Sequence, residues 1–199
     1  MNDPLVLFGL TTSAIELISF VLSIVTVVLN IRQNPWAWLF AIASSFTYAI
    51  VFFGSRLYGD MGLQAVFIIV SMWGWYQWMY GGAAHEGLSV TTSSRAGWGY
   101  GIAGWLAGFA ILAFFLSRFT NTDVPNIDGF LTAGSLLGTV LLSRKKVENW
   151  IVWIVVDILY VGLYLYKGLH LTAILYALFV ILASIGLATW YRESKRAAA

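Results

Sequence analysis

The stretch NWIVWIVVDILYVGLYLYKG, residues 149–168, has the composition of a membrane-spanning helix, yet an acid, Asp157, lies near its middle. About 20 mostly apolar residues in a helix cross the roughly 30 Å hydrocarbon core of a bilayer. A charged side chain at that depth costs at least about 2.5–3.5 kcal/mol, so it is expected to face a cavity or a partner rather than lipid. The stretch therefore predicts a membrane span, with Asp157 as the first candidate for a functional residue.

The composition of the whole chain agrees with a membrane protein. Hydrophobic residues make up 60% of the 199 residues and charged residues 10%, whereas a soluble domain carries about 25% charged residues. The lack of cysteine excludes disulfides and thiolate metal sites, and a net charge of +2 gives no indication of nucleic acid binding. The two histidines have no paired metal ligands and no GxSxG motif beside them. The sequence predicts neither an enzyme nor a bound cofactor or metal, and lipid is the expected surrounding.

Seven stretches are long and apolar enough to cross a bilayer, which predicts an all-α integral membrane protein with seven transmembrane helices. They cover approximately residues 14–31, 36–54, 61–80, 98–117, 126–143, 149–166 and 170–191. The longest connection between them, residues 81–97, is rich in Gly, Ser and Thr.

Lys and Arg are distributed unequally between the two sides of this arrangement. One side receives Arg32, Arg95, Arg144, Lys145, Lys146, Arg192, Lys195 and Arg196. The other side receives Arg56, Arg118 and Lys167. Because cytoplasmic loops carry the excess of basic residues, the C-terminus is predicted to be cytoplasmic and the N-terminus to lie outside.

The sequence contains an internal repeat. A shift of 112 residues aligns 15–78 with 127–190 without gaps, and fifteen of the 64 positions are identical, where roughly five are expected by chance. Each copy holds three spans, and the extra span at 98–117 restores the chain direction, so the copies are parallel in a 3+1+3 plan. The chain is therefore divided into a first repeat (residues 1–80), a loop and linker helix (81–125), and a second repeat with a C-terminal tail (126–199).

Parallel repeats of this kind are typical of transporters, whose substrate site lies between the halves near the membrane midplane. At helical spacing, Asn149, Trp153, Asp157, Tyr160 and Tyr164 form one polar and aromatic stripe. Asp157 is interpreted as a contact for a substrate or an ion. A structural acid, hydrogen-bonded to a neighbouring helix, and a proton-coupling group are the alternatives.

The first repeat carries an equivalent stripe that contains Trp38, Ser45 and Tyr48. Ser45 stands at the position equivalent to Asp157, so the cavity is expected to be acidic on one wall only. Such a cavity suits an asymmetric solute better than a simple ion. Trp150, the equivalent of Trp38, is a further candidate for the cavity wall.

The third helix of each repeat also carries a hydrogen-bonding side chain, and the two side chains are expected at the same depth in the membrane. Gln64 aligns with Tyr176, and both are candidates for substrate binding. For Gln64, an amide that holds neighbouring helices together is an equally good interpretation.

Aromatic and acidic residues at the span ends have simpler explanations. Five aromatic residues are predicted to belong to the interfacial belts of the membrane: Trp36, Trp78, Trp98, Trp190 and Tyr191. Glu16 and Asp128 begin the first helix of their repeats, where an acid caps the helix and complements its dipole; a gate is the alternative.

Two blocks of sequence carry a family resemblance. The first is NPWAWLFAIASSFTYAIVFFGSRLYGDMGLQ followed by FIIVSMWGWYQW, and the second is ENWIVWIVVDILYVGLYLYKGLHLTAILY. Together they resemble the bacterial nicotinamide riboside transporter family, PnuC, over about residues 30–191. The resemblance implies the 3+1+3 plan that this family shares with the SWEET sugar transporters, a place in the bacterial inner membrane, and homo-oligomers, trimers by family expectation. It also implies passive uptake of nicotinamide riboside, an NAD precursor that is trapped afterwards by cytosolic phosphorylation.

The candidate residues suit this cargo, which combines a pyridinium cation, a carboxamide and a ribose. The π faces of Trp153, Tyr160 and Tyr164 would be available to the cation. Asp157 would balance its charge or accept hydrogen bonds from ribose hydroxyls, and Gln64 and Asn149 would each match the carboxamide with one donor and one acceptor. Another small vitamin or nucleoside-like solute is the alternative cargo, and a membrane-embedded enzyme is the alternative of a different class.

Overall fold

The computed structural model describes residues 5–7, 10–12, 14–54, 58–82, 85, 87–120 and 122–197. Within these residues the chain forms seven helices: α1 (Ala14–Ile31), α2 (Trp36–Gly54), α3 (Tyr58–Tyr80), α4 (Arg95–Phe119), α5 (Pro125–Ser143), α6 (Asn149–Tyr166) and α7 (His170–Ala197). The seven predicted spans are confirmed, with ends that agree to within a few residues. A short antiparallel hairpin that the sequence did not predict, β1 (Leu5–Leu7) and β2 (Leu10–Thr12), precedes α1, and β2 lies against α7.

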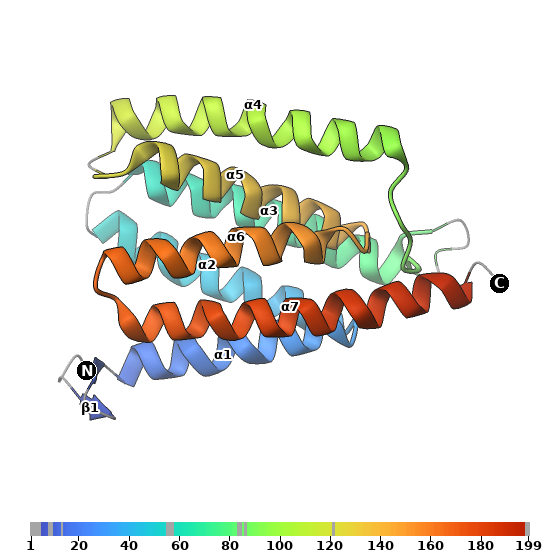
Figure 1. The fold of residues 1–199 in the computed structure, drawn as a ribbon, viewed down its shortest axis with the longest axis horizontal. Coiled ribbons are helices and arrows are strands. Elements are labelled where there is room, and N and C mark those ends of the chain that lie inside the picture. Colours follow the sequence, from blue (N-terminus) through green and yellow to red (C-terminus); the bar gives the residue numbers. More distant parts are fainter. Residues whose placement is uncertain are drawn as a thin grey trace.

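All seven helices run nearly parallel or antiparallel to one another in a single bundle (Figure 1). Over their described residues, α4, α6 and α7 are long and apolar enough to cross a membrane by themselves. α5 is less apolar because it carries Asp128 and several Gly, Ser and Thr residues, many of which are buried inside the bundle. Small and polar residues on a central helix are expected where the helix faces protein and a cavity rather than lipid.

Six of the helices close into a ring. α1 packs on α2, α2 on α3, α3 on α5, α5 on α6, α6 on α7, and α7 returns to α1, while α4 lies outside the ring against α5. The repeat relates α1 to α5, α2 to α6 and α3 to α7, so the α3–α5 contact is the equivalent of the α7–α1 contact. The two repeats are therefore parallel and related by an internal twofold axis, with α4 as the linker.

The turns between the first two helices of each repeat also match. Gln33 in the α1–α2 turn has a φ of 54° and Lys145 in the α5–α6 turn has a φ of 48°, and the two positions are 112 residues apart. Residues other than glycine rarely adopt this left-handed conformation. The shared conformation supports the repeat at the level of the backbone.

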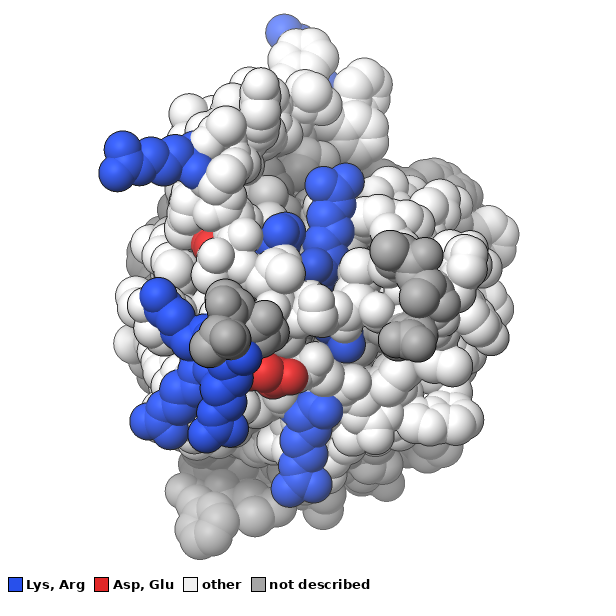
Figure 2. Space-filling model, turned by 90° about the vertical axis from the view of Figure 1, so that its right-hand side faces the viewer, with Lys and Arg blue, Asp and Glu red and all other residues white. Residues whose placement is uncertain are grey.

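The end of the bundle at which α1, α3, α5 and α7 finish is strongly basic. Lys and Arg side chains crowd this face, with few acids between them (Figure 2). The residues at this end include Arg32, Arg95, Arg144, Lys145, Lys146, Arg192, Lys195 and Arg196. The charge asymmetry on which the predicted sidedness depends is therefore present on one face of the folded molecule, which we call the basic end.

Candidate functional site

A cavity of about 750 Å³ lies inside the ring, and its lining residues come from all six ring helices. Several of the lining residues are equivalent in the two repeats: Ser23 and Ser135, Trp38 and Trp150, Ser45 and Asp157, Phe67 and Phe179. The cavity therefore straddles the internal twofold axis. This is the place where a transporter built from two parallel repeats is expected to hold its substrate.

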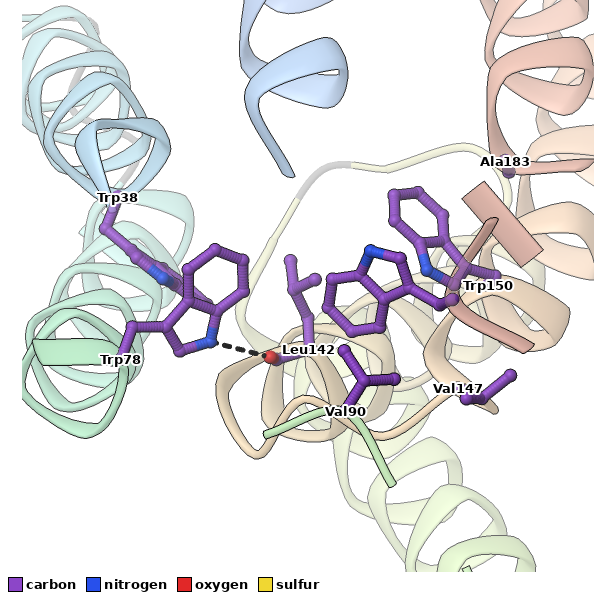
Figure 3. Close-up of a cluster of buried hydrophobic side chains, with 8 residues drawn as sticks. Trp38, Trp78, Val90, Leu142, Val147, Trp150 and Ala183 are labelled. Atoms are coloured by element: carbon purple, nitrogen blue, oxygen red, sulfur yellow. Dashed lines mark hydrogen bonds between the residues drawn. The ribbon is translucent and has the colours of Figure 1, made fainter. Parts of the chain in front are cut away.

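Four tryptophans from both repeats form the floor of the cavity toward the basic end (Figure 3). Trp38 meets Trp78 edge to face, with ring centroids 5.5 Å apart, and Trp150 meets Trp190 in the same way at 5.4 Å. Trp78 and Trp190 lie 6.1 Å apart across the axis. We call this group the tryptophan floor; Trp38 and Trp150 also line the cavity above it.

Trp38 and Trp150, which line the cavity, are the inner pair of the floor, and Trp78 and Trp190, farther from the cavity, are the outer pair. The outer pair ties the two repeats together. The Trp78 indole N–H donates to the Leu142 carbonyl of α5 at 3.0 Å (dashed in Figure 3), and the Trp190 indole N–H donates to the Ile31 carbonyl of α1 at 3.0 Å. Both carbonyls belong to the last turns of helices, which lack partners within the helix. Each third helix thus caps the first helix of the other repeat.

The prediction that Trp78 and Trp190 belong to an interfacial belt is wrong. Trp78 is 4% exposed and Trp190 is fully buried, because both face the axis rather than lipid. The prediction treated the span ends separately, whereas the repeat already paired these two residues. Trp36, Trp98 and Tyr191 are exposed at the helix ends, as the belt interpretation requires.

A segment between α3 and α4 covers the floor from the basic end. This strap, residues 88–94, pairs with the α5–α6 turn through Thr91, whose N–H donates to the Lys145 carbonyl at 3.1 Å and whose carbonyl accepts from Val147 at 3.0 Å. The Ser93 N–H and hydroxyl donate to the two Glu148 carboxylate oxygens at 2.7 and 3.0 Å. Val90 of the strap is buried in the floor (Figure 3). The cavity is therefore closed toward this end by two layers.

Lys145 lies at the same place with a largely buried side chain. Its ammonium group is 5.0 Å from the centroid of the Trp78 ring. Burial lowers the pKa of Lys145, and the charge of Glu193 opposes that shift. Glu193 also accepts a hydrogen bond from the Gln33 side chain at 2.6 Å, which connects α7 to the α1–α2 turn.

Asp157 lies in the cavity wall and is only 3% exposed. Among the described residues, no side chain forms a hydrogen bond or an ion pair with its carboxylate. Next to it, Tyr160 and Tyr176 line the cavity, with ring centroids 4.7 Å apart. A buried acid without a protein partner requires another source of compensation, and its position makes that source a group that enters the cavity.

The structure brings seven of the predicted site residues together around the cavity: Asp157, Trp153, Tyr160, Trp150, Tyr176, Trp38 and Ser45. Trp153 packs closely against α5, where a β-carbon at Gly138 would come to 3.0 Å from its ring. The lining therefore includes the middle of the predicted α6 stripe and its equivalents in the other repeat.

Three other predicted residues lie outside the cavity lining. Asn149 is fully buried at the start of α6, and its amide donates to the Lys146 carbonyl at 2.6 Å. Tyr164 stacks on Tyr160 with ring centroids 5.6 Å apart and so lies behind the wall. Gln64 is half-buried on α3. The side chain of Tyr48 lies outside the part of the chain that the structure describes.

α1 also contributes to the wall, which the sequence did not predict. Ser23, Thr26 and Asn30 line the cavity, and they follow one another at steps of three and four in an otherwise apolar helix. Polar residues at this spacing lie on one face of a helix, so the pattern indicates that this face of α1 points away from lipid. Further lining residues that were not predicted are Ser44 and Thr47 of α2 and Thr139 of α5.

Of the two acids near the starts of the repeats, Glu16 and Asp128, the structure describes the side chain of Asp128 only. Asp128 lies in the first turn of α5 and accepts a hydrogen bond from the Thr122 hydroxyl in the α4–α5 connection. This arrangement agrees with the helix-end interpretation of Asp128. The side chain of Glu16 lies outside the described residues.

A ring of membrane helices around a largely apolar cavity that holds a buried acid, on an internal twofold axis, is the arrangement expected of a transporter of small solutes. Residues 13–192 match the sequence model of a family described as "Nicotinamide mononucleotide transporter". The chain belongs to this family, and it is a transporter of vitamin-like small molecules rather than an enzyme.

Individual relatives agree with the family and differ in their cargo. The riboflavin/roseoflavin transporter RibM of Streptomyces davaonensis is 27% identical over 98% of this chain and 92% of its own length. The nicotinamide riboside transporter PnuC of Escherichia coli is 20% identical over the same shares. The crystal structure of the vitamin B3 transporter PnuC superposes with a TM-score of 0.69 and 25% identity, over 90% of this chain and 81% of that one.

Proposed function

We propose that this protein takes up nicotinamide riboside by facilitated diffusion through the cavity on the internal axis. The observation that carries the proposal is the Asp157 carboxylate, buried in the cavity wall without a partner among the described residues. Nicotinamide riboside carries a pyridinium cation, which would supply the missing opposite charge. A neutral solute would leave the acid uncompensated, at a cost in free energy on binding.

The aromatic residues beside Asp157 support a flat cationic cargo. Trp153, Tyr160 and Tyr176 share the wall with the carboxylate, and a cation over a desolvated aromatic face gains roughly 2 kcal/mol. The equivalent α2 positions of the first repeat carry Ala41 and Ser45 in place of Trp153 and Asp157. The ring of the substrate is therefore expected to lie against the second repeat.

The same chemistry disfavours a phosphorylated cargo. A phosphate brings negative charge toward Asp157, and the described residues that line the cavity include no lysine or arginine to compensate it. Nicotinamide mononucleotide formed in the cytosol would consequently be excluded, which makes uptake one-way once the riboside is phosphorylated.

Sidedness and assembly complete the proposal. The eight basic residues at the basic end support an orientation in which that end, with the C-terminus, lies in the bacterial cytoplasm and the N-terminus lies outside the inner membrane. The tryptophan floor and the strap then separate the cavity from the cytoplasm. The family resemblance also supports a homo-oligomer, with a trimer as the expected form.

Uptake of radiolabelled nicotinamide riboside into proteoliposomes tests the proposal. The wild-type protein is expected to equilibrate the unchanged riboside, with little competition from nicotinamide mononucleotide. Asp157→Asn is expected to weaken riboside binding at least roughly tenfold, because it removes the charge and keeps the shape. Asp123→Asn makes the same change at an exposed acid outside the cavity and is the matched control. Unchanged riboside binding by both Asp157→Asn and Trp153→Ala would refute the proposal.

Riboflavin is the second candidate cargo, because the riboflavin transporter RibM is more similar to this chain than PnuC of Escherichia coli is, at 27% against 20% identity. Riboflavin combines a flat ring with a hydroxylated chain, but it is uncharged. Riboflavin transport that persists in Asp157→Asn, together with no uptake of the riboside by the wild-type protein, would identify this cargo instead.

A further inference from the structure

The two walls of the cavity differ in side-chain volume at equivalent positions. On α6 the residues Trp153 and Asp157 face the cavity, whereas Ala41 and Ser45 occupy these positions on α2. Ser44 likewise stands where α6 carries Val156. Because the α2 side chains are smaller at these three positions, this part of the first-repeat wall leaves more room for a ligand than the equivalent part of α6 does.

Three polar side chains on this wall offer hydrogen-bond acceptors to the cavity. The Thr26 hydroxyl donates to the Leu22 carbonyl at 2.9 Å, and the Thr47 hydroxyl donates to the Ala43 carbonyl at 2.9 Å. A hydroxyl that donates its proton to its own helix has only lone pairs left for a ligand. The side-chain oxygen of Asn30 is buried and has no hydrogen-bond partner within the described residues.

An acceptor-rich pocket beside small side chains suits a group with several hydroxyl donors. A buried amide oxygen without a partner costs about 1–3 kcal/mol, and a ligand hydroxyl would remove that cost. Water molecules would satisfy these acceptors in the empty cavity, and sugar hydroxyls reproduce the same hydrogen bonds. The charged wall of the second repeat lies on the other side of the axis, so one ligand with a cationic ring and a hydroxylated group would contact both walls.

We propose that Thr26, Asn30 and Ala41 form a separate subsite for the hydroxylated part of the substrate, and that the small side chain of Ala41 limits the size of the group that enters. This inference rests on the proposed function and assigns the first repeat a role in it. The second repeat recognises the ring and its charge, and the first repeat recognises the sugar. The loss of twofold symmetry in the wall is then the basis of substrate orientation.

Two ligands that differ only in the sugar separate this role from a structural one. Nicotinamide riboside and 1-methylnicotinamide share the pyridinium cation and the carboxamide, but only the riboside carries hydroxyls. Asn30→Leu introduces the residue that the second repeat has at this position, Leu142. It is expected to weaken riboside binding about tenfold, the effect of one lost hydrogen bond to a buried acceptor. Binding of 1-methylnicotinamide is expected to change less than about twofold.

Two further variants guard against misfolding as an explanation. Thr26→Val removes a hydroxyl at constant shape, and Thr189→Val is its matched control, because the Thr189 hydroxyl makes the same type of bond to the Ile185 carbonyl outside the cavity. Ala41→Leu is expected to reduce riboside binding at least roughly tenfold by occupying the volume, again without affecting 1-methylnicotinamide. Equal effects on both ligands, or no effect on either, would overturn the subsite.

Failure of the proposed function gives a different result from failure of the subsite. If the wild-type protein binds riboflavin and not the riboside, the cargo proposal fails. The same variants are then measured with riboflavin and with lumiflavin, which has the same isoalloxazine ring with a methyl group in place of the hydroxylated chain. Selective loss of riboflavin binding supports the subsite, and parallel loss of both ligands refutes it. Binding of none of these compounds would refute both proposals.

Discussion

The Trp150 indole lies so close to Gly186 of α7 that a β-carbon on this glycine would come within 2.6 Å of the ring. Trp38 has the same relationship to Gly74 of α3, also at 2.6 Å. In each repeat, therefore, the second helix inserts an indole into a space that the third helix leaves open by lacking a side chain. The tryptophan floor depends on this space, because the two indoles form its inner pair.

Alanine at either glycine is expected to destabilise the protein. Gly186→Ala and Gly74→Ala force the indoles to move within a packed cluster, at a cost of about 1–3 kcal/mol. Gly162→Ala and Gly104→Ala are matched controls, since a β-carbon at these helical glycines meets no atom within 4 Å. The controls are expected to be neutral or slightly stabilising, because alanine is the better helix former. Thermal unfolding in detergent makes the comparison; equal melting temperatures for variants and controls would contradict the packing argument.

The inner and outer tryptophans of the floor are expected to respond differently to the loss of the indole nitrogen. Trp78→Phe removes a donor to the Leu142 carbonyl, whereas Trp38→Phe removes an N–H that is buried without a partner among the described residues. Both rings are almost fully buried. Trp78→Phe should therefore cost more by about 1–2 kcal/mol in the free energy of unfolding.

The second repeat provides an independent test of the same contrast. Trp190 donates to the Ile31 carbonyl, and the Trp150 N–H has no partner within the described residues. Denaturant unfolding without substrate should give the same order for Trp190→Phe and Trp150→Phe. An inverted order in both repeats would mean that the inner N–H groups have partners that the hydrogen-bond pattern does not reveal.

The membrane fold could be predicted closely from the sequence because the hydrocarbon thickness fixes the length of an apolar helix. The helix ends were less predictable, since a helix continues after its apolar residues end. α7 runs through Arg192 to Ala197, and α4 begins at Arg95, where the Ser94 side chain accepts a hydrogen bond from the Gly97 N–H. Both extensions lie beyond the apolar run of their helix, so the hydrophobic pattern gives no indication of them.

The candidate site could be predicted only in part. The acid on α6 was prominent because a charge at the membrane midplane is costly, and the repeat identified Trp38 and Trp150 as equivalents. A serine or threonine is cheap in an apolar helix, since its hydroxyl bonds to a carbonyl of its own helix. Thr26 therefore gave little signal, and neighbouring Asn30 was recognisable only once the packing of the ring showed which face of α1 points inward.

Replacement of Lys145 by methionine is expected to stabilise the protein near neutral pH. Burial lowers the pKa of Lys145 below its usual value, which means that the folded state disfavours the ammonium form. The penalty is complete below the lowered pKa, declines as the pH rises, and vanishes above the unfolded value of about 10.4. The advantage of Lys145→Met over the wild-type protein should therefore shrink toward alkaline pH.

Unfolding measured as a function of pH checks this prediction. Lys146→Met is the control, because the adjacent side chain is only half-buried and its ammonium group donates a hydrogen bond to the Thr91 hydroxyl in the strap. The control is expected to show no gain at neutral pH. A Lys145→Met advantage that grows with pH would mean that the ammonium form stabilises the fold, through the Trp78 ring or through Glu193.

An exchange of residues between the two walls tests whether the position of the acid matters or only its presence. The double variant Asp157→Ser with Ser45→Asp keeps one carboxylate in the cavity but moves it across the internal axis. There it lies beside Ala41, away from the aromatic side chains of Trp153 and Tyr160. If the cation needs the charge and the π faces on the same wall, as proposed, the exchange will not restore riboside uptake beyond that of Asp157→Ser alone. Recovery to near the wild-type rate in proteoliposomes would instead mean that the acid acts through its charge from either wall.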